Sequence, residues 1–264
     1  MSISEKTRVE MREVIARYPR SRSAIMPMLH LVQAEEGFVS PAGIEVIAEE
    51  LELTTAEVTA VATFYSMYKR RPVGDYHVGV CTNTLCAVMG GDAIFERLKD
   101  HLEVGNDETT PDGKITLEHI ECNAACDYAP VMTVNWEFMD NMTPQSATDL
   151  VDDLRSGAEV SSTRGARLCT WREAERVLAG FPDDRADEGP SAGPASLVGL
   201  DIAREKGWTA PEAEGRPAVT SGRASREAAA ETADTGRAET ETKVDESPAD
   251  AKHEANPAKG DEAK

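Results

Sequence analysis

Four cysteines in two pairs are the residues of this chain whose types and spacing could carry chemistry. Cys81 and Cys86 are spaced C-x4-C, and Cys122 and Cys126 are spaced C-x3-C. Each pair directly follows an apolar run that predicts a β-strand. Four convergent thiolates can hold an iron–sulfur cluster, which transfers electrons one at a time. A protein of this kind would need partners that donate and accept those electrons.

The spacing leaves three kinds of thiol chemistry open. A [2Fe–2S] cluster takes two protein ligands on each iron, and two cysteine pairs on two loops can supply them. Structural zinc also takes four thiolates, but usually from C-x2-C pairs, which this chain lacks. Inert thiols are the third possibility. The lack of C-x2-C also argues against a thioredoxin-type dithiol, and disulfides are not expected in a reducing cytoplasm.

Other residues are weaker candidates for a site. His77 and His119 lie in the strand-like runs near the cysteines, but four cysteines already suffice for a cluster, so we expect packing or surface positions for both. Cys169 has no paired neighbour and is expected not to be a ligand. The basic run at residues 69–71 is expected to be a solvated helix end, with contact to an acidic partner as the alternative. The sequence contains no nucleotide-binding or hydrolase motif.

Two kinds of element must position the cysteines, which makes the fold class α+β. Residues 1–71 show helical periodicity and are predicted to form a helical bundle. Its helices are expected at residues 2–18, 23–37, 40–51 and 54–65. Residues 72–157 are predicted to follow the order β-α-β-β-β-α, as a small sandwich with a mixed sheet, like thioredoxin. Strands are expected at residues 76–80, 115–120, 131–134 and 136–142, with helices at 90–102 and 143–154.

Residues 158–264 are predicted to be a long, acidic, low-complexity and mostly disordered tail. Aromatic residues become rare there, so the tail has little apolar area to offset the entropy of ordering it. Residues 169–179 and 196–208 could form short helices that dock on a neighbour. Since isolated helices of this length are unstable in water, marginal helices in a disordered tail are preferred. A chain that ends at Gly157 is therefore expected to fold.

Charge and hydropathy exclude several classes of function. The chain has 264 residues and a net charge of −20, so nucleic acid and anionic membrane surfaces would repel it. No stretch approaches the ~20 apolar residues that cross a bilayer, and the N-terminus lacks the apolar region of a signal peptide. We therefore expect a cytoplasmic protein with no nucleic-acid partner and no direct membrane insertion.

The sequence around the cysteines resembles a known family. The run from Ala62 to Cys81, then Cys86, then Glu121-Cys122-x3-Cys126 and Ala129-Pro130, is similar to the E subunit of the proton-pumping NADH:quinone oxidoreductase, respiratory complex I. The resemblance covers about residues 5–157. Family members often have Leu-Gly-Ala between the last two cysteines, where this chain has Asn-Ala-Ala. Loss of that glycine could alter the loop geometry or the cluster potential, but not the number of ligands.

The resemblance implies a helical bundle followed by a thioredoxin-like [2Fe–2S] ferredoxin domain, with Cys81, Cys86, Cys122 and Cys126 as ligands. The implied partners are the flavoprotein that binds NADH and FMN (the F subunit) and the large iron–sulfur protein beside it (the G subunit). The complex would pass electrons from NADH to quinone and export protons, with this chain peripheral on the cytoplasmic face of the membrane. In the family the cluster lies near the flavin but off the main electron chain, which implies electron storage or tuning.

Two other assignments stay open at this point. The equivalent diaphorase component of an NAD-linked hydrogenase or formate dehydrogenase would keep the cofactor and change the assembly. A zinc-stabilised interaction module would have no redox role.

Overall fold

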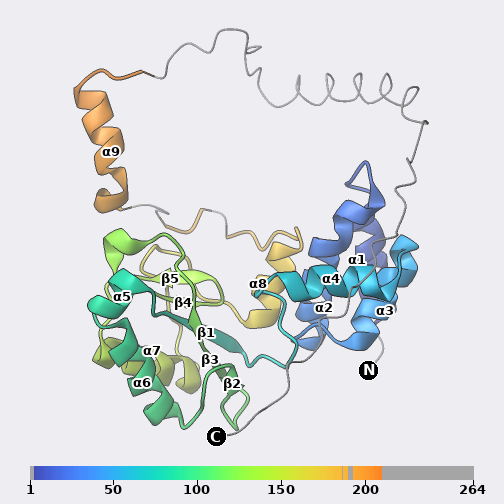
Figure 1. Cartoon of the computed structure of the whole chain (residues 1–264), viewed down its shortest axis with the longest axis horizontal. Helices are drawn as coiled ribbons and strands as arrows, with labels where there is room; N and C mark the ends of the chain where they lie inside the picture. The colour runs from blue at the N-terminus through green and yellow to red at the C-terminus, as the bar shows by residue number, and fades with distance from the viewer. Residues whose placement is uncertain (1–2, 186, 190–192, 210–264) are drawn as a thin grey trace, which may run out of the picture. The chain divides into compact units, whose positions relative to one another are not determined.

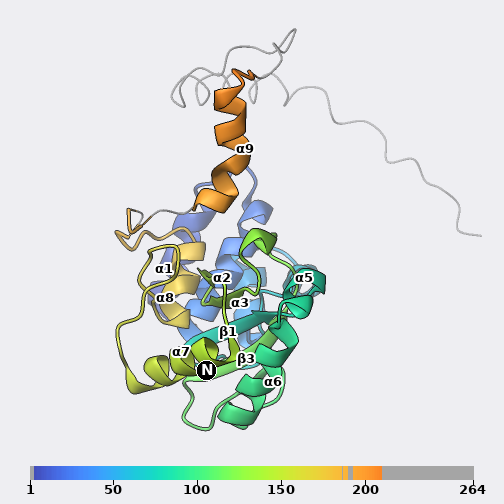
Figure 2. The same cartoon turned by 90° about the vertical axis from the view of Figure 1, so that its left-hand side faces the viewer.

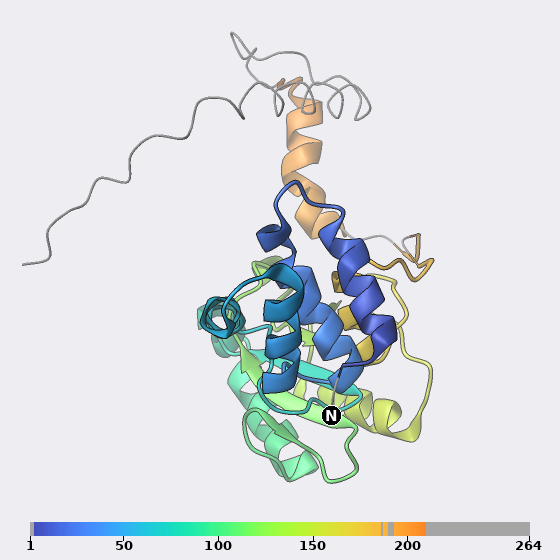
Figure 3. The same ribbon diagram turned by 90° about the vertical axis from the view of Figure 1, so that its right-hand side faces the viewer.

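Four α-helices form where the N-terminal sequence repeats apolar residues at helical spacing. The computed structural model describes residues 3–185, 187–189 and 193–209 (Figure 1). The helices are α1 (Glu5–Ile15), α2 (Ile25–Glu36), α3 (Pro41–Leu51) and α4 (Thr55–Phe64), with a 3-10 turn, η1 (Ser21–Ala24) (Figure 3, blue). Ser40 Oγ caps α3 by accepting from the Gly43 N–H (2.9 Å), and Thr54 caps α4. The predicted helical bundle therefore forms, and its first core lies among these helices.

A five-stranded mixed sheet follows the bundle, as predicted. Its strands are β1 (Tyr76–Cys81), β2 (Glu108–Thr109), β3 (Ile115–Ile120), β4 (Met132–Val134) and β5 (Glu137–Met139), in the order β2-β3-β1-β4-β5. β1 and β3 are parallel, and the other neighbours are antiparallel. Cys81 pairs with Ile120 in the parallel register. Because parallel strands end at the same edge, both cysteine loops leave the sheet on one side.

Three helices accompany this sheet: α5 (Thr84–Val88), α6 (Gly91–Leu102) and α7 (Pro144–Ser156). α6 and α7 pack together on one side of β1 and β3 (Figure 2), over the second apolar core. The predicted strand at 136–142 is shorter than expected, because positive φ at Trp136 places it in the turn after β4 and positive φ at Asn141 interrupts the extended backbone beyond Met139. The short elements α5 and β2 were not predicted, since two to five residues show no clear periodicity.

The segment after α7 differs from the prediction. Helix α8 (Trp171–Leu178) packs on α2, and the Trp171 side chain is fully buried, with its Nε1 donating to the Gly37 carbonyl (3.0 Å). The expectation of a marginal helix here is wrong, because composition averaged over the whole tail hides one amphipathic helix. The predicted disorder of residues 210–264 lies outside the described residues. The domain boundary at residue 71 stays a prediction.

A second tail helix, α9 (Pro194–Glu205), has no buried side chain and contacts the body at η2 (Cys126–Tyr128), a turn in the second cysteine loop. None of the helices in the described part of the chain is long and apolar enough to cross a membrane.

A buried carboxylate joins α8 to the bundle and the sheet. Glu175 lies 2.6 Å from His30 Nδ1 and accepts hydrogen bonds from Gln33 Nε2 (2.7 Å) and Trp136 Nε1 (3.1 Å). Buried polar groups of this kind are costly unless each is paired, so α8 satisfies groups that α2 would otherwise leave open.

Lys69 is not in a solvated helix end. It is buried and forms an ion pair with Glu118 of β3, which also lies 2.6 Å from His77 Nε2. Burial alone would raise the pKa of Glu118, but the hydrogen bonds and charges of His77 and Lys69 outweigh it and lower that pKa to about 2. Arg70 and Arg71 are exposed as expected, but the prediction is wrong for Lys69, because α4 ends before this run and the chain then turns inward against the sheet.

Candidate functional site

The first cysteine pair is buried at the end of β1. Cys81 is the last residue of the strand, and Cys86 lies within α5. Burial raises the pKa of the Cys81 thiol most strongly, a hydrogen bond from the Asn83 backbone lowers it, and the neighbouring Cys86 raises it, to about 11 overall. A thiol in this environment becomes a thiolate only with a compensating cation beside it.

Gly91 allows the backbone to pass close to this cysteine pair, a role that was not predicted from the sequence. A Cβ atom at Gly91 would lie 2.4 Å from the Cys81 carbonyl oxygen and 2.9 Å from that of Cys86. Only glycine therefore fits where α6 begins against the first cysteine loop. The Gly-Gly dipeptide four residues after Cys86 was the available sign.

The second pair lies on the loop after β3 and is more open to solvent. Cys122 is exposed and Cys126 is half-buried, and their sulfur atoms are 3.5 Å apart. The Ala124 N–H donates to Cys122 Sγ at 3.4 Å, and Ala124 has a φ of 56°. The contact with Cys122 is the main influence that raises the pKa of the Cys126 thiol. Cys126 opens a short 3-10 turn, η2 (Cys126–Tyr128).

The two loops meet at one edge of the sheet. Asn83 Nδ2, in the first loop, donates to Glu121 Oε2 in the second (3.0 Å). Cys81, Cys86 and Ala125 belong to one small apolar cluster that spans both loops. The structure thus brings the two cysteine loops together at this edge, and the four cysteines as one ligand set stay a prediction.

The donor set of this site fits a two-iron cluster. Within the described residues, no group of three or more His, Cys, Asp or Glu side chains is placed around a single metal ion. The thiols are instead arranged as a buried pair and an open pair on two separate loops. A [2Fe–2S] cluster needs two thiolates on each of its irons, and these pairs would supply them.

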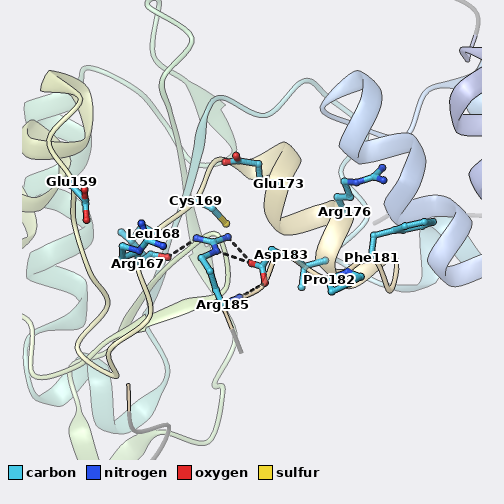
Figure 4. Close-up of a pocket in the computed structure, with 11 residues that line it drawn as sticks. Glu159, Arg167, Leu168, Cys169, Glu173, Arg176, Phe181, Pro182, Asp183 and Arg185 are labelled. Carbon is cyan, nitrogen blue, oxygen red and sulfur yellow. Dashed lines mark hydrogen bonds and ion pairs between the residues drawn. The ribbon is translucent and has the colours of Figure 1, made fainter. Parts of the chain in front are cut away.

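The weaker candidates lie elsewhere. Cys169 lines a pocket of about 410 Å³ beside α8, next to Arg185 and Asp183 (Figure 4). Burial is the largest influence on its thiol and raises its pKa. His77 is buried against Trp136 and pairs with Glu118, whereas His119 is exposed. Both histidines thus take the packing and surface positions expected of them.

Comparison with known proteins identifies relatives of this chain. Residues 11–155 match the family described as thioredoxin-like [2Fe-2S] ferredoxin. The E subunit of NADH-quinone oxidoreductase from Mycobacterium tuberculosis is 61% identical over 208 residues, covering 78% of this chain and 82% of the relative. NADH-quinone oxidoreductase subunit 2 of Thermus thermophilus is 40% identical over 148 residues, covering 55% of this chain and 82% of the relative.

Solved structures show a more distant similarity. An NAD⁺-reducing [NiFe]-hydrogenase in the air-oxidised state has a TM-score of 0.46 and 18% identity, and the match covers 53% of this chain and 24% of that one. A similarity of this size does not discriminate between assemblies.

Proposed function

The chain belongs to the thioredoxin-like [2Fe–2S] ferredoxin family, among the E subunits of NADH-quinone oxidoreductase, and from this premise we propose that Cys81, Cys86, Cys122 and Cys126 bind its [2Fe–2S] cluster. The observation that carries the proposal is the meeting of both cysteine pairs at one edge of the sheet. The family match favours iron–sulfur over the zinc alternative.

In this proposal each cysteine pair holds one iron. Cys81 and Cys86, buried below the loops, exclude water from the inner side of the site, while the exposed Cys122 marks the side that a redox partner can approach. The Ala124 N–H donates to the Cys122 sulfur and stabilises negative charge there. When bound, the cluster supplies one-electron transfer.

The partner in this proposal is the NADH-binding flavoprotein of the complex, its F subunit, whose FMN would exchange single electrons with the cluster after oxidising NADH. The iron–sulfur G subunit would lie beside it, and the assembly would sit on the cytoplasmic face of the membrane. The relatives at 61% identity, which are E subunits of NADH-quinone oxidoreductase, favour this assembly over a hydrogenase or formate dehydrogenase diaphorase.

Low-temperature EPR with iron and sulfide analysis of the anaerobically purified, dithionite-reduced chain tests the cofactor. We expect a rhombic spin-one-half signal with two irons and two sulfides per chain. No signal, with no iron and one zinc per chain, would contradict the proposal.

Cysteine variants test the ligand assignment. Cys81→Ser or Cys122→Ser is expected to lose most of the iron and sulfide, because each removes one of four ligands. Cys169→Ser is the matched control and is expected to keep full cluster content, since Cys169 lies beside α8 and Arg185. Full iron content in either ligand variant, or iron loss in the control, would refute the assignment.

The flavin partnership needs a separate measurement. In the complex co-purified with the flavoprotein, the reduced cluster is expected to speed the spin relaxation of the flavin radical, because paramagnets at electron-transfer distance interact. The Cys122→Ser complex, which lacks the cluster, is the control. Equal relaxation in both complexes would argue against an FMN partner.

A further inference from the structure

The segment that follows α7 returns to the second cysteine loop. Thr163 is held against the end of β5 by three hydrogen bonds. Its N–H and Oγ1 donate to the Phe138 carbonyl (3.2 and 3.0 Å), and its Oγ1 accepts from the Asp140 N–H (3.0 Å). A bridge between Ser161 and Arg167 closes the segment into a narrow turn. The tip of this turn is thereby fixed against the end of β5.

Arg164, at that tip, is held in one orientation. Its Nε and Nη2 donate to the two carboxylate oxygens of Asp140 at 3.0 and 3.1 Å. Its guanidinium carbon lies 3.9 Å from the centre of the Phe138 ring and 5.7 Å from that of Tyr128. The side chains of Arg164 and Asp140 are only 22% and 8% exposed. A guanidinium that makes a bidentate ion pair with a carboxylate and stacks on an aromatic ring is far better ordered than that of an ordinary surface arginine.

The two aromatic rings connect Arg164 to the cysteines. Tyr128 and Phe138 both pack against the apolar cluster that contains Cys81 and Cys86. Tyr128 also ends the turn that begins at Cys126, and its carbonyl accepts from the Asn141 N–H (2.8 Å). The arginine therefore contacts the same two rings that pack against the cluster of Cys81 and Cys86.

We propose that Arg164 is a positioning residue for the [2Fe–2S] cluster, holding Tyr128 and Phe138 against the cysteine loops and balancing the charge of Asp140. The inference rests on the proposed assignment of Cys126 as a ligand. Arg164 lies beyond residues 11–155, the part that matches the family, so this support belongs to the extension of the chain rather than to the family domain.

Charge gives the inference a specific test. Reduction adds one negative charge to the cluster, so a nearby positive charge raises the reduction potential and a negative charge lowers it. Arg164→Gln leaves Asp140 unpaired and should lower the potential. Asp140→Asn leaves Arg164 unpaired and should raise it. A role in folding alone would not separate the two variants by sign, because both break the same ion pair.

The experiment is a redox titration followed by EPR on the full-length chain with its cluster, together with the rate of iron release to a chelator. Arg164→Lys is expected to keep the potential near that of the wild type but to release iron about tenfold faster, because lysine keeps the charge and loses the fork and the stacking. Arg167 lies in the same turn as Arg164 and forms an ion pair with the distant Glu188. Arg167→Gln breaks that pair, so it is the matched control and should change neither the potential nor the rate of iron release.

Two outcomes would overturn the inference. One is a shift of the reduction potential in the same direction for Arg164→Gln and Asp140→Asn. The other is a wild-type potential and a wild-type rate of iron release for these two variants and for Arg164→Lys. If Arg164→Gln does not fold, Asp140→Asn and Arg164→Lys still decide it. A wild-type chain without a two-iron cluster, or a Cys126→Ser variant that keeps full iron content, would instead refute the proposed function.

Discussion

Ala124, between the proposed ligands Cys122 and Cys126, affects the conformation of the second cysteine loop. It adopts the left-handed backbone conformation, which costs an L-residue roughly 1–2 kcal/mol. The family resemblance gives a glycine at this position, so the departure noted in the sequence falls on the residue where glycine has a conformational advantage. Its N–H donates to Cys122 Sγ, so strain here is coupled directly to a proposed ligand.

Ala124→Gly is therefore expected to stabilise the second loop. Glycine adopts the left-handed conformation without the steric penalty, but it loses more conformational entropy on folding than alanine does. The two effects together leave a net stabilisation of about 0.5–1 kcal/mol. Iron release to a chelator should slow by about two- to fivefold. Ala124→Val should act in the opposite direction, because a β-branched side chain is less tolerant of positive φ. Faster release from the glycine variant would contradict this account.

Gly91→Ala should damage the first loop. The added methyl group would lie 2.4 Å from the Cys81 carbonyl oxygen, so the backbone that carries the buried cysteine pair must move. We expect a loss of stability of about 1–3 kcal/mol and reduced iron content in the purified chain. Gly199→Ala, where no atom lies within 4 Å of the added Cβ, serves as the control and should match the wild type. Normal iron content in Gly91→Ala would show that α6 can shift without disturbing the site.

At the scale of elements, helix α8 is the part whose role the sequence concealed. Its Trp171 ring packs against His77 and Trp136 of the sheet, and its Glu175 satisfies His30 and Gln33 of the bundle. The helix thus contacts both the bundle and the sheet although it lies beyond the family match.

Trp171→Ala should lower the free energy of unfolding by about 3–5 kcal/mol, the usual cost of deleting a buried aromatic side chain. Trp171→Phe should cost less, because it keeps most of the packing and loses the hydrogen bond to Gly37. Urea denaturation followed by circular dichroism measures both variants. Trp208→Ala, at a side chain that is 64% exposed, is the control and should change stability by less than about 0.5 kcal/mol. Equal effects at the two tryptophans would refute the core position of α8.

Local patterns predicted the long elements well. Ser40-Pro41 and Thr54-x-x-Glu57 mark the starts of α3 and α4, because caps depend on neighbours within four residues. The order of elements predicted the mixed sheet, but the parallel pairing of β1 with β3, which brings the cysteine loops together, was not predicted from the sequence. Lys69 and Arg164 could not be placed in the same way, since their partners Glu118 and Asp140 lie far along the chain and no spacing rule connects them.

At the scale of the whole molecule, the structure reverses the expectation for a chain that ends at Gly157. Such a chain loses α8 with its fully buried Trp171, and it removes the carboxylate partner of His30 and Gln33. We expect low soluble yield and a lower urea midpoint than for the full chain. A chain that ends at Thr209 keeps all of these contacts, and the composition of the remaining residues predicts no further core, so it should match the full-length protein. Equal midpoints for the two truncations would show that α8 adds no stability.

The separation of 145 residues between His30 and Glu175 also has a consequence for biosynthesis. A ribosome adds about 5–20 residues per second, so His30 of α2 is synthesised about 7–30 s before its carboxylate partner. Both cysteine pairs are translated within that interval. All four thiols are therefore synthesised before the bundle can pack against α8, and we expect the cysteine loops to form before that contact does.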